Sequence, residues 1–422
     1  MTRPKTLTEK TTARRAAAPS ADGPLSTPIA LLGGLSPETF MRRHWQKKPL
    51  LIRQAVPGVT PPLDRAALFA LAAQDDVESR LIVHEQGGAA QATKARGKAK
   101  EATAAADWRL VHGPLARKAL PPLTQPAWTL LVQGLDLHVP AAHELLSRFR
   151  FVPEARLDDL MISYATEGGG VGPHYDSYDV FLLQVHGQRR WRIGRLKDDS
   201  LLPDVPLKIL SHFEAEEEWV LEPGDMLYLP PRWAHDGIAE GGECMTCSIG
   251  FRAPDAQGLA AELLVRVAEN LDDTRRQLYK DPSQAATTEP GRMPADLQAF
   301  ALEAVTRALR DPLQLHAALG EILTEPKPKV WFELGDTLPD GVGVVLDART
   351  RMMYDDKHLF ANGESWRAAG ADARLLRRLA DARSLSARDV ASASPEAREL
   401  LDQWAEDGWL HPAPNLDNPD QH

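Results

Sequence analysis

Residues 168–181 read Gly-Gly-Gly-Val-Gly-Pro-His-Tyr-Asp-Ser-Tyr-Asp-Val-Phe, and the prediction of the fold rests first on this segment. His174 and Asp176 lie two positions apart where the chain enters a predicted strand, so both side chains point to the same face. That face carries one imidazole and one carboxylate, which are both ligands of transition metals. The nearby Asp179 and His186 are predicted to be structural, because Asp179 has the opposite parity and His186 precedes a turn glycine.

A third metal ligand is predicted at His235. It ends the segment Glu-Pro-Gly-Asp-Met-Leu-Tyr-Leu-Pro-Pro-Arg-Trp-Ala-His, residues 222–235, where a turn, a short strand and a proline-stiffened loop would orient the imidazole. Two histidines and one carboxylate on one face of a metal are typical of non-haem Fe(II) oxygenases, which keep other positions open for oxygen and a cosubstrate. An H-x-D pair alone is more commonly a surface or core histidine beside a strand aspartate, and the glycine-rich lead-in and the downstream segment favour the metal site.

A cosubstrate such as 2-oxoglutarate would need a cation for its far carboxylate, and a guanidinium supplies two parallel hydrogen bonds. Arg189 shares its strand parity with the apolar Trp191 and is the candidate, whereas Arg190 and Arg192 are expected on the exposed face. Ser163, on the preceding predicted strand, is a candidate for a hydroxyl bond to the same carboxylate. A buried serine that bonds to the backbone is the alternative.

The wider pattern predicts an antiparallel β-sandwich or barrel between residues 157 and 251, where short apolar runs alternate with Gly and Pro. Helical spacing follows: Leu259, Leu263, Val267 and Leu271 form one stripe, Asp255 is a possible cap, and a second helix begins at Pro294. These helices either pack against the sandwich or form a dimer interface. The Pro326–Pro328 stretch is predicted to be a linker to mixed strands and helices typical of a winged-helix-like unit.

Two segments have the composition of flexible chain. Residues 1–25 lack a hydrophobic period and are predicted to be disordered. Residues 87–106 are rich in Gly, Ala, Lys and Gln and lie between two strand-like pieces, so a hairpin loop or insertion is expected there.

Composition narrows the function classes. A net charge of −10 argues against nucleic-acid binding through the overall field and suits a basic partner protein. No apolar run approaches the roughly 20 residues needed to span a bilayer. The two cysteines, Cys244 and Cys247, are expected to be core thiols in a reducing cytoplasm rather than a zinc or redox site.

Together these residues resemble the JmjC-type cupin oxygenases, and within them the bacterial ribosomal oxygenases. The resemblance covers most of residues 36–254 and part of the C-terminal region. It rests on the following segments: Phe40 with Trp45–Ile52, Asp158–Ser163, Gly168–Phe181, Arg189–Arg192, Glu222–Pro231, Gly250–Pro254 and Phe360–Glu364. The insertion at residues 87–106, and Tyr175 and Ser177 beside the predicted ligands, depart from the family pattern.

The resemblance implies an α+β protein with a double-stranded β-helix (cupin, or JmjC jelly roll) core at 26–253, a helical dimerisation region at 254–328 and a winged-helix-like domain at 329–422. It implies Fe(II) on His174, Asp176 and His235, with O2 as co-reactant and 2-oxoglutarate on Arg189 with Ser163. The implied reaction is hydroxylation of an arginine in a large-subunit ribosomal protein by a cytoplasmic homodimer.

Three other functions fit the sequence. A demethylase of the same fold would use the same metal residues. A cupin that binds metal without 2-oxoglutarate chemistry would not need Arg189. A regulatory module would bind a partner through the net-acidic C-terminal unit, with an inert sandwich.

Overall fold

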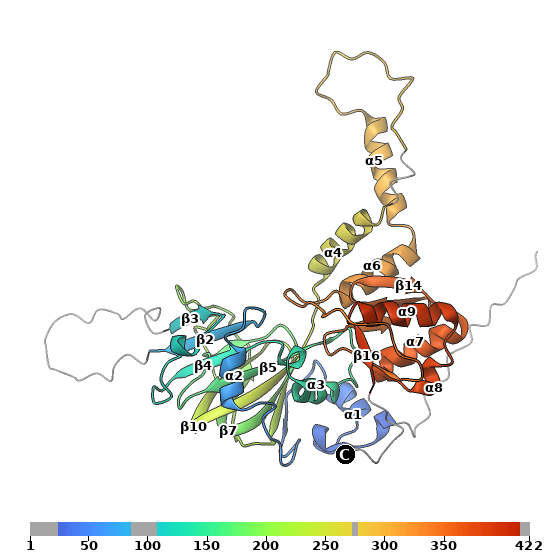
Figure 1. The fold of residues 1–422 in the computed structure, drawn as a ribbon. Helices are drawn as coiled ribbons and strands as arrows, with labels where there is room; N and C mark the ends of the chain where they lie inside the picture. The colour runs from blue at the N-terminus through green and yellow to red at the C-terminus, as the bar shows by residue number, and fades with distance from the viewer. Residues whose placement is uncertain (1–23, 86–107, 272–276, 414–422) are drawn as a thin grey trace, which may run out of the picture.

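The computed structural model describes residues 24–85, 108–271 and 277–413 (Figure 1). The predicted loop at 87–106 and residues 1–23 of the predicted tail lie outside these ranges. The described chain begins with a short 3-10 turn, η1 (Pro24–Ser26).

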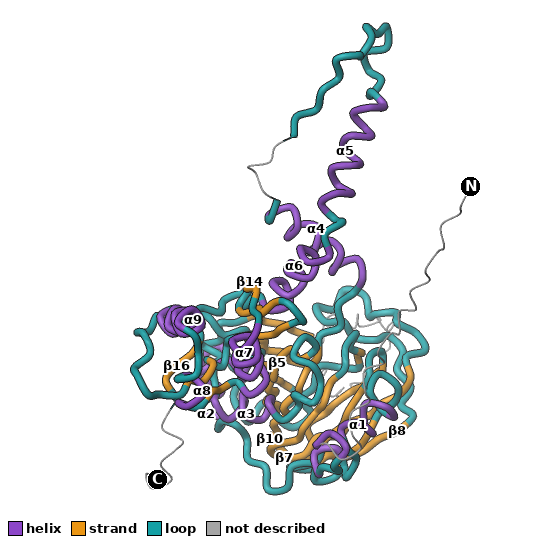
Figure 2. The backbone as a smooth tube through the Cα atoms, turned by 90° about the vertical axis from the view of Figure 1, so that its right-hand side faces the viewer, coloured by secondary structure: helices purple, strands orange, loops and turns teal. Residues whose placement is uncertain are grey.

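One antiparallel sheet of ten strands forms the first domain, in the order β1-β9-β7-β10-β5-β4-β2-β3, with β6 paired to β10 and β8 to β7 (Figure 2). Strand β7 is long because the chain continues to pair with β10 through a register shift. The strands are β1 (Leu50–Ile52), β2 (Ser79–His84), β3 (Trp108–His112), β4 (Trp128–Val132), β5 (Leu157–Ala165), β6 (His174–Tyr175), β7 (Val180–Arg195), β8 (Glu217–Leu221), β9 (Met226–Leu229) and β10 (Trp233–Phe251).

The main core lies between this sheet and three short helices, α1 (Pro37–Arg43), α2 (Arg65–Leu71) and α3 (Pro140–Ser147). Phe40 of α1 is fully buried and packs edge-on against Tyr228, with 4.9 Å between the ring centroids. The Tyr228 hydroxyl donates to buried Asp179 at 2.6 Å. Asp179 therefore has a structural role in the core, as predicted.

Three helices connect the two domains: α4 (Ala256–Glu269), α5 (Ala295–Ala308) and α6 (Pro312–Thr324). Asp255 caps α4 by accepting from the Gly258 amide, which confirms the predicted start. Helix α5 buries none of its residues and projects away from both domains (Figure 1). Within the described ranges, no helix has the length and apolar character needed to cross a membrane.

The C-terminal domain has two small sheets, ordered β15-β11-β16 and β12-β13-β14, around a core centred on Trp404. It has the mixed strands and helices expected of a winged-helix-like unit. The Ser394 side chain caps α9 by accepting from the Ala397 amide, and Gly408 follows that helix with a positive φ of 73°. The elements are β11 (Val344–Leu346), β12 (Met352–Tyr354), β13 (His358–Ala361), β14 (Glu364–Arg367), α7 (Gly370–Ala382), β15 (Ser384–Leu385), α8 (Ala387–Val390), α9 (Pro395–Glu406) and β16 (Leu410–Pro412).

Guanidinium groups join the two domains. Arg150 donates to the carbonyls of Ala380 and Asp381 at 2.8 and 2.6 Å. From the other side, Arg349 donates to the Leu137 carbonyl at 3.3 Å. The C-terminal domain is therefore fixed beside the end of the large sheet from which β5 begins.

Helix α6 packs closely on the C-terminal domain at Gly320, so a substitution of this glycine tests the contact. A Cβ at Gly320 would lie 2.3 Å from the Phe360 ring. We expect Gly320→Ala to lower the free energy of unfolding by about 1–3 kcal/mol in spite of the better helix propensity of alanine. Denaturant unfolding with Gly291→Ala as control, where nothing lies within 4 Å, checks this. Equal stability of Gly320→Ala and wild type would contradict the packing.

Candidate metal and cosubstrate site

Strand pairing brings His174 and His235 together. His174 of β6 lies directly opposite His235 of β10 in the antiparallel register, and the two ring centroids are 4.3 Å apart. Asp176 follows two residues after His174, and its Oδ2 lies 3.6 Å from His235 Nε2. One ligand atom from each of the three residues lies within 4.8 Å of the others, a spacing that suits a single metal ion.

Both imidazoles are oriented by their own backbone. His174 Nδ1 lies 2.9 Å from the Gly172 carbonyl, and His235 Nδ1 lies 2.9 Å from the Trp233 carbonyl. A carbonyl can only accept, so each Nδ1 donates its proton and leaves Nε2 with a free lone pair. Hydrogen bonds of this kind fix the tautomer and ring direction of metal-binding histidines.

Burial keeps His235 neutral. Its side chain is 3% exposed, and burial, followed by the nearby His174, lowers the pKa of His235 to about 4, although Asp176 opposes the shift. A neutral imidazole is the form that binds a metal.

Gly237, two residues farther along β10, lies against the Trp191 ring, where a Cβ would come within 2.6 Å of it.

The three residues open into a cavity of about 450 Å³, which Arg189 also lines. Arg189 is 5% exposed, and its Nη1 lies 3.4 Å from the Ser163 hydroxyl, which is its one hydrogen-bond partner in the described chain. Its Nε and Nη2 are buried without a partner. A buried guanidinium with unpaired donors is costly and suits an anionic ligand group.

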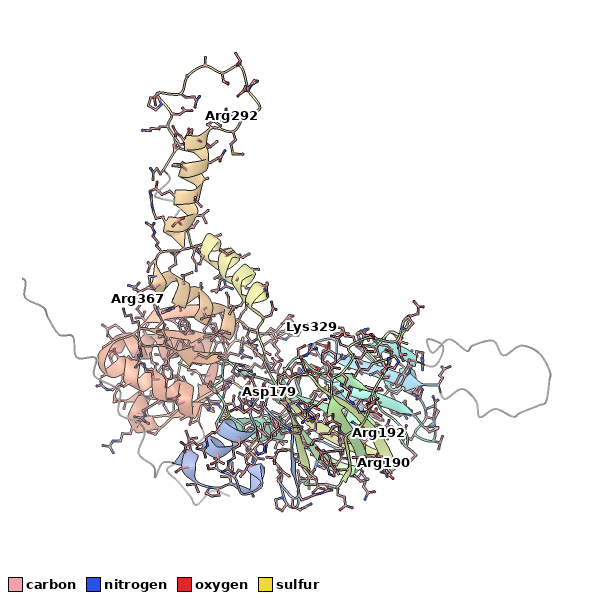
Figure 3. All side chains as sticks on the ribbon, turned by 180° about the vertical axis from the view of Figure 1, so that it is seen from behind. Asp179, Arg190, Arg192, Arg292, Lys329 and Arg367 are labelled. Atoms are coloured by element: carbon pink, nitrogen blue, oxygen red, sulfur yellow. The ribbon has the colours of Figure 1, made fainter. Side chains whose placement is uncertain are left out.

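Arg190 and Arg192 of this strand point away from the cavity. Arg190 pairs with Glu218 and Glu240, and Arg192 pairs with Asp236, on the outer side of the sheet (Figure 3). Arg189, Arg190 and Arg192 therefore face the sides of the sheet that strand parity predicted.

His186, which the sequence placed in a turn, lies in β7 beside the register shift, and its side chain is 48% exposed.

One wall of the cavity was not identified as functional from the sequence. Asp159 and Met161 line it together with Ser163, because alternate residues of β5 face the cavity while Leu160 and Ile162 enter the core. Tyr178 and Ser248 complete this wall. Strand alternation from Ser163 could have found the two β5 residues; Ser248 had no comparable signal.

The residues present fit the groups that the chemistry requires. Two imidazoles and one carboxylate on one side of an open cavity match a metal that keeps positions for other ligands. The unpaired Arg189 nitrogens in the same cavity match the carboxylate of a small diacid. Among the residues described, these are the features of a metal site combined with an acid-binding cosubstrate pocket.

The neutral state of His235 predicts a dependence of stability on pH. An unfolded histidine has a pKa of roughly 6.5, so between about pH 6.5 and 4 the unfolded chain binds a proton that folded His235 does not. The free energy of unfolding of the metal-free protein should therefore fall as the pH falls through this window. His235→Gln should show a shallower decline in denaturant titrations. Identical slopes would contradict a neutral His235.

Comparisons with known families match three regions of the chain. Residues 144–259 match the JmjC domain, residues 306–411 match the ROXA-like winged helix, and residues 211–321 match the AraC-like ligand binding domain. The first two matches coincide with the part of the sheet that carries the predicted metal residues and with most of the C-terminal domain.

Curated proteins and solved structures agree with these matches. The ribosomal protein uL16 3-hydroxylase of Escherichia coli is 31% identical and covers 77% of this chain and 84% of its own. A probable ribosomal oxygenase of Haemophilus influenzae is 29% identical over 89% of this chain and 96% of its own. The structure of Escherichia coli YcfD, a ribosomal oxygenase, has a TM-score of 0.74 at 28% identity and covers 89% of this chain and 97% of its own.

A structure of YcfD in complex with cobalt and 2-oxoglutarate has a TM-score of 0.70 at 28% identity, with 89% of this chain and 98% of that chain covered. The predicted resemblance is therefore confirmed at the level of the family. The chain belongs to the ribosomal oxygenases of the JmjC class, which are 2-oxoglutarate-dependent dioxygenases.

Proposed function

We propose that this protein hydroxylates an arginine side chain of a large-subunit ribosomal protein, with Fe(II), 2-oxoglutarate and O2. The observation that carries the proposal is that the His174, Asp176 and His235 ligand atoms share one cavity with the unpaired, buried guanidinium of Arg189. A metal-binding cupin without 2-oxoglutarate would have no use for that cation, and burying it unpaired would be costly.

The roles of the metal residues follow from their geometry. His174 and His235 would bind iron through Nε2, because each Nδ1 is bonded to a backbone carbonyl. Asp176 would supply the carboxylate. When bound, iron with 2-oxoglutarate supplies the oxidising power that inserts one atom of O2 into a C–H bond, while the cosubstrate loses carbon dioxide and becomes succinate.

Arg189 and Ser163 would orient the cosubstrate. The guanidinium lies deep in the cavity, and its Nε and Nη2 can donate in parallel to the far carboxylate of 2-oxoglutarate. Ser163 donates to the Thr246 carbonyl at 3.4 Å and accepts from Arg189, so it holds the guanidinium in position as well as lying near its ligand. Trp191, with its ring centroid 5.6 Å from the Arg189 carbon Cζ, restricts the guanidinium further.

The target side chain would lie against the wall formed by Asp159, Met161 and Tyr178. Within the described part of the chain, three donors reach Oδ2 of Asp159 and none reaches Oδ1. Oδ1 lies 3.6 Å from the place that a Cβ on Gly250 would take, and Gly250 lines the cavity. A carboxylate oxygen there favours a cationic target, and the net charge of −10 favours approach of a basic ribosomal protein.

The proposal extends to assembly and location. Helices α4 and α5 expose large apolar side chains, among them Leu264, Val265, Leu302 and Val305. We propose that they form a homodimer interface in region 254–328, between a catalytic domain at 26–253 and a C-terminal domain at 329–422. A ribosomal protein substrate places the enzyme in the cytoplasm, and no direct contact with nucleic acid is required.

The reaction is tested by mass spectrometry. Purified large-subunit ribosomal proteins, given the Fe(II) enzyme, 2-oxoglutarate and O2, should gain one oxygen on one arginine. The gain should disappear in Asp176→Ala and persist in Asp199→Ala, whose side chain is 61% exposed.

Other outcomes separate the alternatives. Succinate without any oxygen gain would contradict the ribosomal substrate, whereas formaldehyde release would identify a demethylase of the same fold. Activity without 2-oxoglutarate would identify a cupin of another type. No metal binding by wild type or His174→Ala would leave a regulatory module.

The role of Arg189 is tested separately. Arg189→Met should raise the KM for 2-oxoglutarate at least about tenfold, because a charge-assisted bidentate contact is lost, while Mn(II) affinity stays near the wild-type value. Arg190→Met is the matched control, since Arg190 pairs with Glu218 and Glu240 outside the cavity. An unchanged KM in Arg189→Met would remove Arg189 from the cosubstrate site.

A further inference from the structure

A lysine from outside the catalytic domain contacts Asp158 and Asp159, two carboxylates that line the active-site cavity and form its acidic wall. Lys327 Nζ lies 3.0 Å from Asp158 Oδ1 and 3.4 Å from Asp159 Oδ2. The lysine belongs to the segment that joins α6 to the C-terminal domain, and Pro326 and Pro328 on either side limit its backbone freedom. The ion pair is partly buried, with side-chain exposures of 26% for Lys327 and 4% for Asp159.

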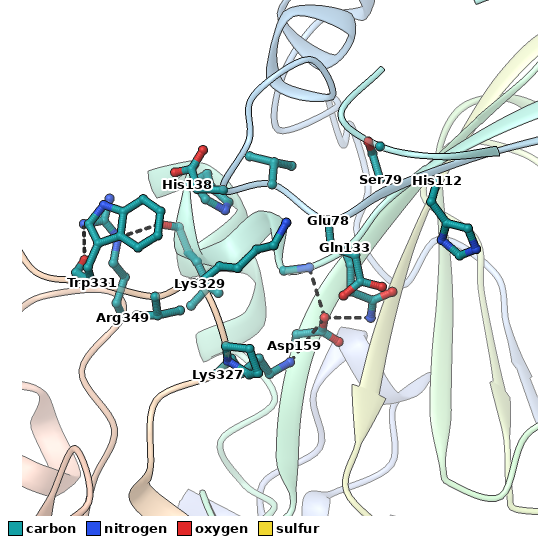
Figure 4. Close-up of a pocket in the computed structure, with 17 residues that line it drawn as sticks. Glu78, Ser79, His112, Gln133, His138, Asp159, Lys327, Lys329, Trp331 and Arg349 are labelled. Carbon is teal, nitrogen blue, oxygen red and sulfur yellow. Dashed lines mark hydrogen bonds and ion pairs between the residues drawn. The ribbon is translucent and has the colours of Figure 1, made fainter. Parts of the chain in front are cut away.

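Lys327 lines two cavities that border the active-site cavity. A cavity of about 390 Å³ shares Gln133 and Asp159 with the active-site cavity (Figure 4). Another, of about 570 Å³, shares Asp158 and Tyr178 with it. Lys327 lines both neighbours but not the active-site cavity itself, so it lies at the rim and away from the metal residues.

The ion pair with Lys327 leaves Oδ1 of Asp159 available to a ligand. Lys327, Gln133 Nε2 and the Gly134 amide all donate to Oδ2, at 3.4, 2.8 and 3.0 Å. Oδ1 faces Gly250 and the active-site cavity. The ammonium therefore does not block a target side chain; it lowers the negative charge that such a side chain meets.

The second carboxylate is balanced in the same way. Asp158 Oδ1 accepts from Lys327 and, at 3.3 Å, from Arg252 Nε. Burial alone would raise the pKa of Asp158, but these two cations together lower it, so the carboxylate stays ionised and paired. Of the two cations at the wall, Lys327 is the one that reaches both carboxylates.

We infer that Lys327 is a specificity-determining residue, which weakens the hold of the acidic wall on a cationic target side chain through its contact with Asp158 and Asp159. This inference rests on the proposed function and adds a role for the segment that leads to the C-terminal domain. A pocket with the full charge of both carboxylates would bind substrate and the equally cationic hydroxylated product more tightly. Lys327 thus favours release, and it does not touch the reacting atoms.

The test compares Lys327→Met with wild type on an arginine-containing peptide from the ribosomal substrate. Removing one charge a few ångströms from the target should lower the peptide KM about three- to tenfold, and added salt should shrink the difference. The KM for 2-oxoglutarate should not change, and kcat should stay equal or fall. Lys327→Arg should behave as wild type because the charge is restored.

Lys329→Met is the matched control. Lys329 lies in the same segment and lines the cavity of about 390 Å³, but its Nζ donates to the backbone carbonyl of Asp75 at 2.9 Å. Its removal should leave the peptide KM unchanged. Thermal unfolding of each variant shows whether the fold is intact.

The outcomes separate the two proposals. A peptide KM that is unchanged or raised in a folded Lys327→Met, or a Lys327→Arg variant that fails to restore the wild-type value, would overturn the role of Lys327 while leaving the proposed function standing. A wild-type enzyme that hydroxylates no arginine in any ribosomal protein would overturn the proposed function, and the inference would fall with it.

Discussion

The antiparallel pairing of β10 with β6 and β7 sets the positions of both metal histidines and of Arg189. It places His235 of β10 opposite His174 of β6 and also opposite Ile193 of β7. Because side chains alternate along a strand, a slip of one residue in this register would turn His235 away from the cavity. Gly237 allows Trp191 to lie flat against β10 at the next inward position. The two metal histidines are thus placed by strand pairing, and Asp176, just beyond β6, is held by the hydrogen bond that its carbonyl accepts from the Arg232 amide at 2.8 Å.

The sequence predicted the features that depend on local pattern. Parity along one strand separated Arg189 from Arg190 and Arg192, and Asp255 and Ser394 mark helix starts by their side-chain chemistry. What it missed depends on contacts between distant segments. Asp311 and Pro312 mark the start of α6, but Gly320 in its interior weakens the helical signal, and the helix is stable because it packs on β13. The pairing of Lys327 with Asp158 and Asp159 likewise joins residues far apart in sequence.

The acidic wall links the chemistry to the rest of the chain. Asp159 is held by Gln133 and Gly134 within the catalytic domain and by Lys327 from the segment beyond it. The C-terminal domain is fixed beside this wall through Arg150 and Arg349. The net-acidic winged-helix-like unit therefore borders the cavity next to the active site, which Trp331 and Arg349 line.

The central claim is that one cavity binds both the metal and the far carboxylate of 2-oxoglutarate. A crystal structure of the protein with Mn(II) and 2-oxoglutarate tests it most directly. We expect Mn(II) on His174, Asp176 and His235, with the far carboxylate bonded to Arg189. A metal bound elsewhere, or a cosubstrate whose far carboxylate does not contact Arg189, would contradict it.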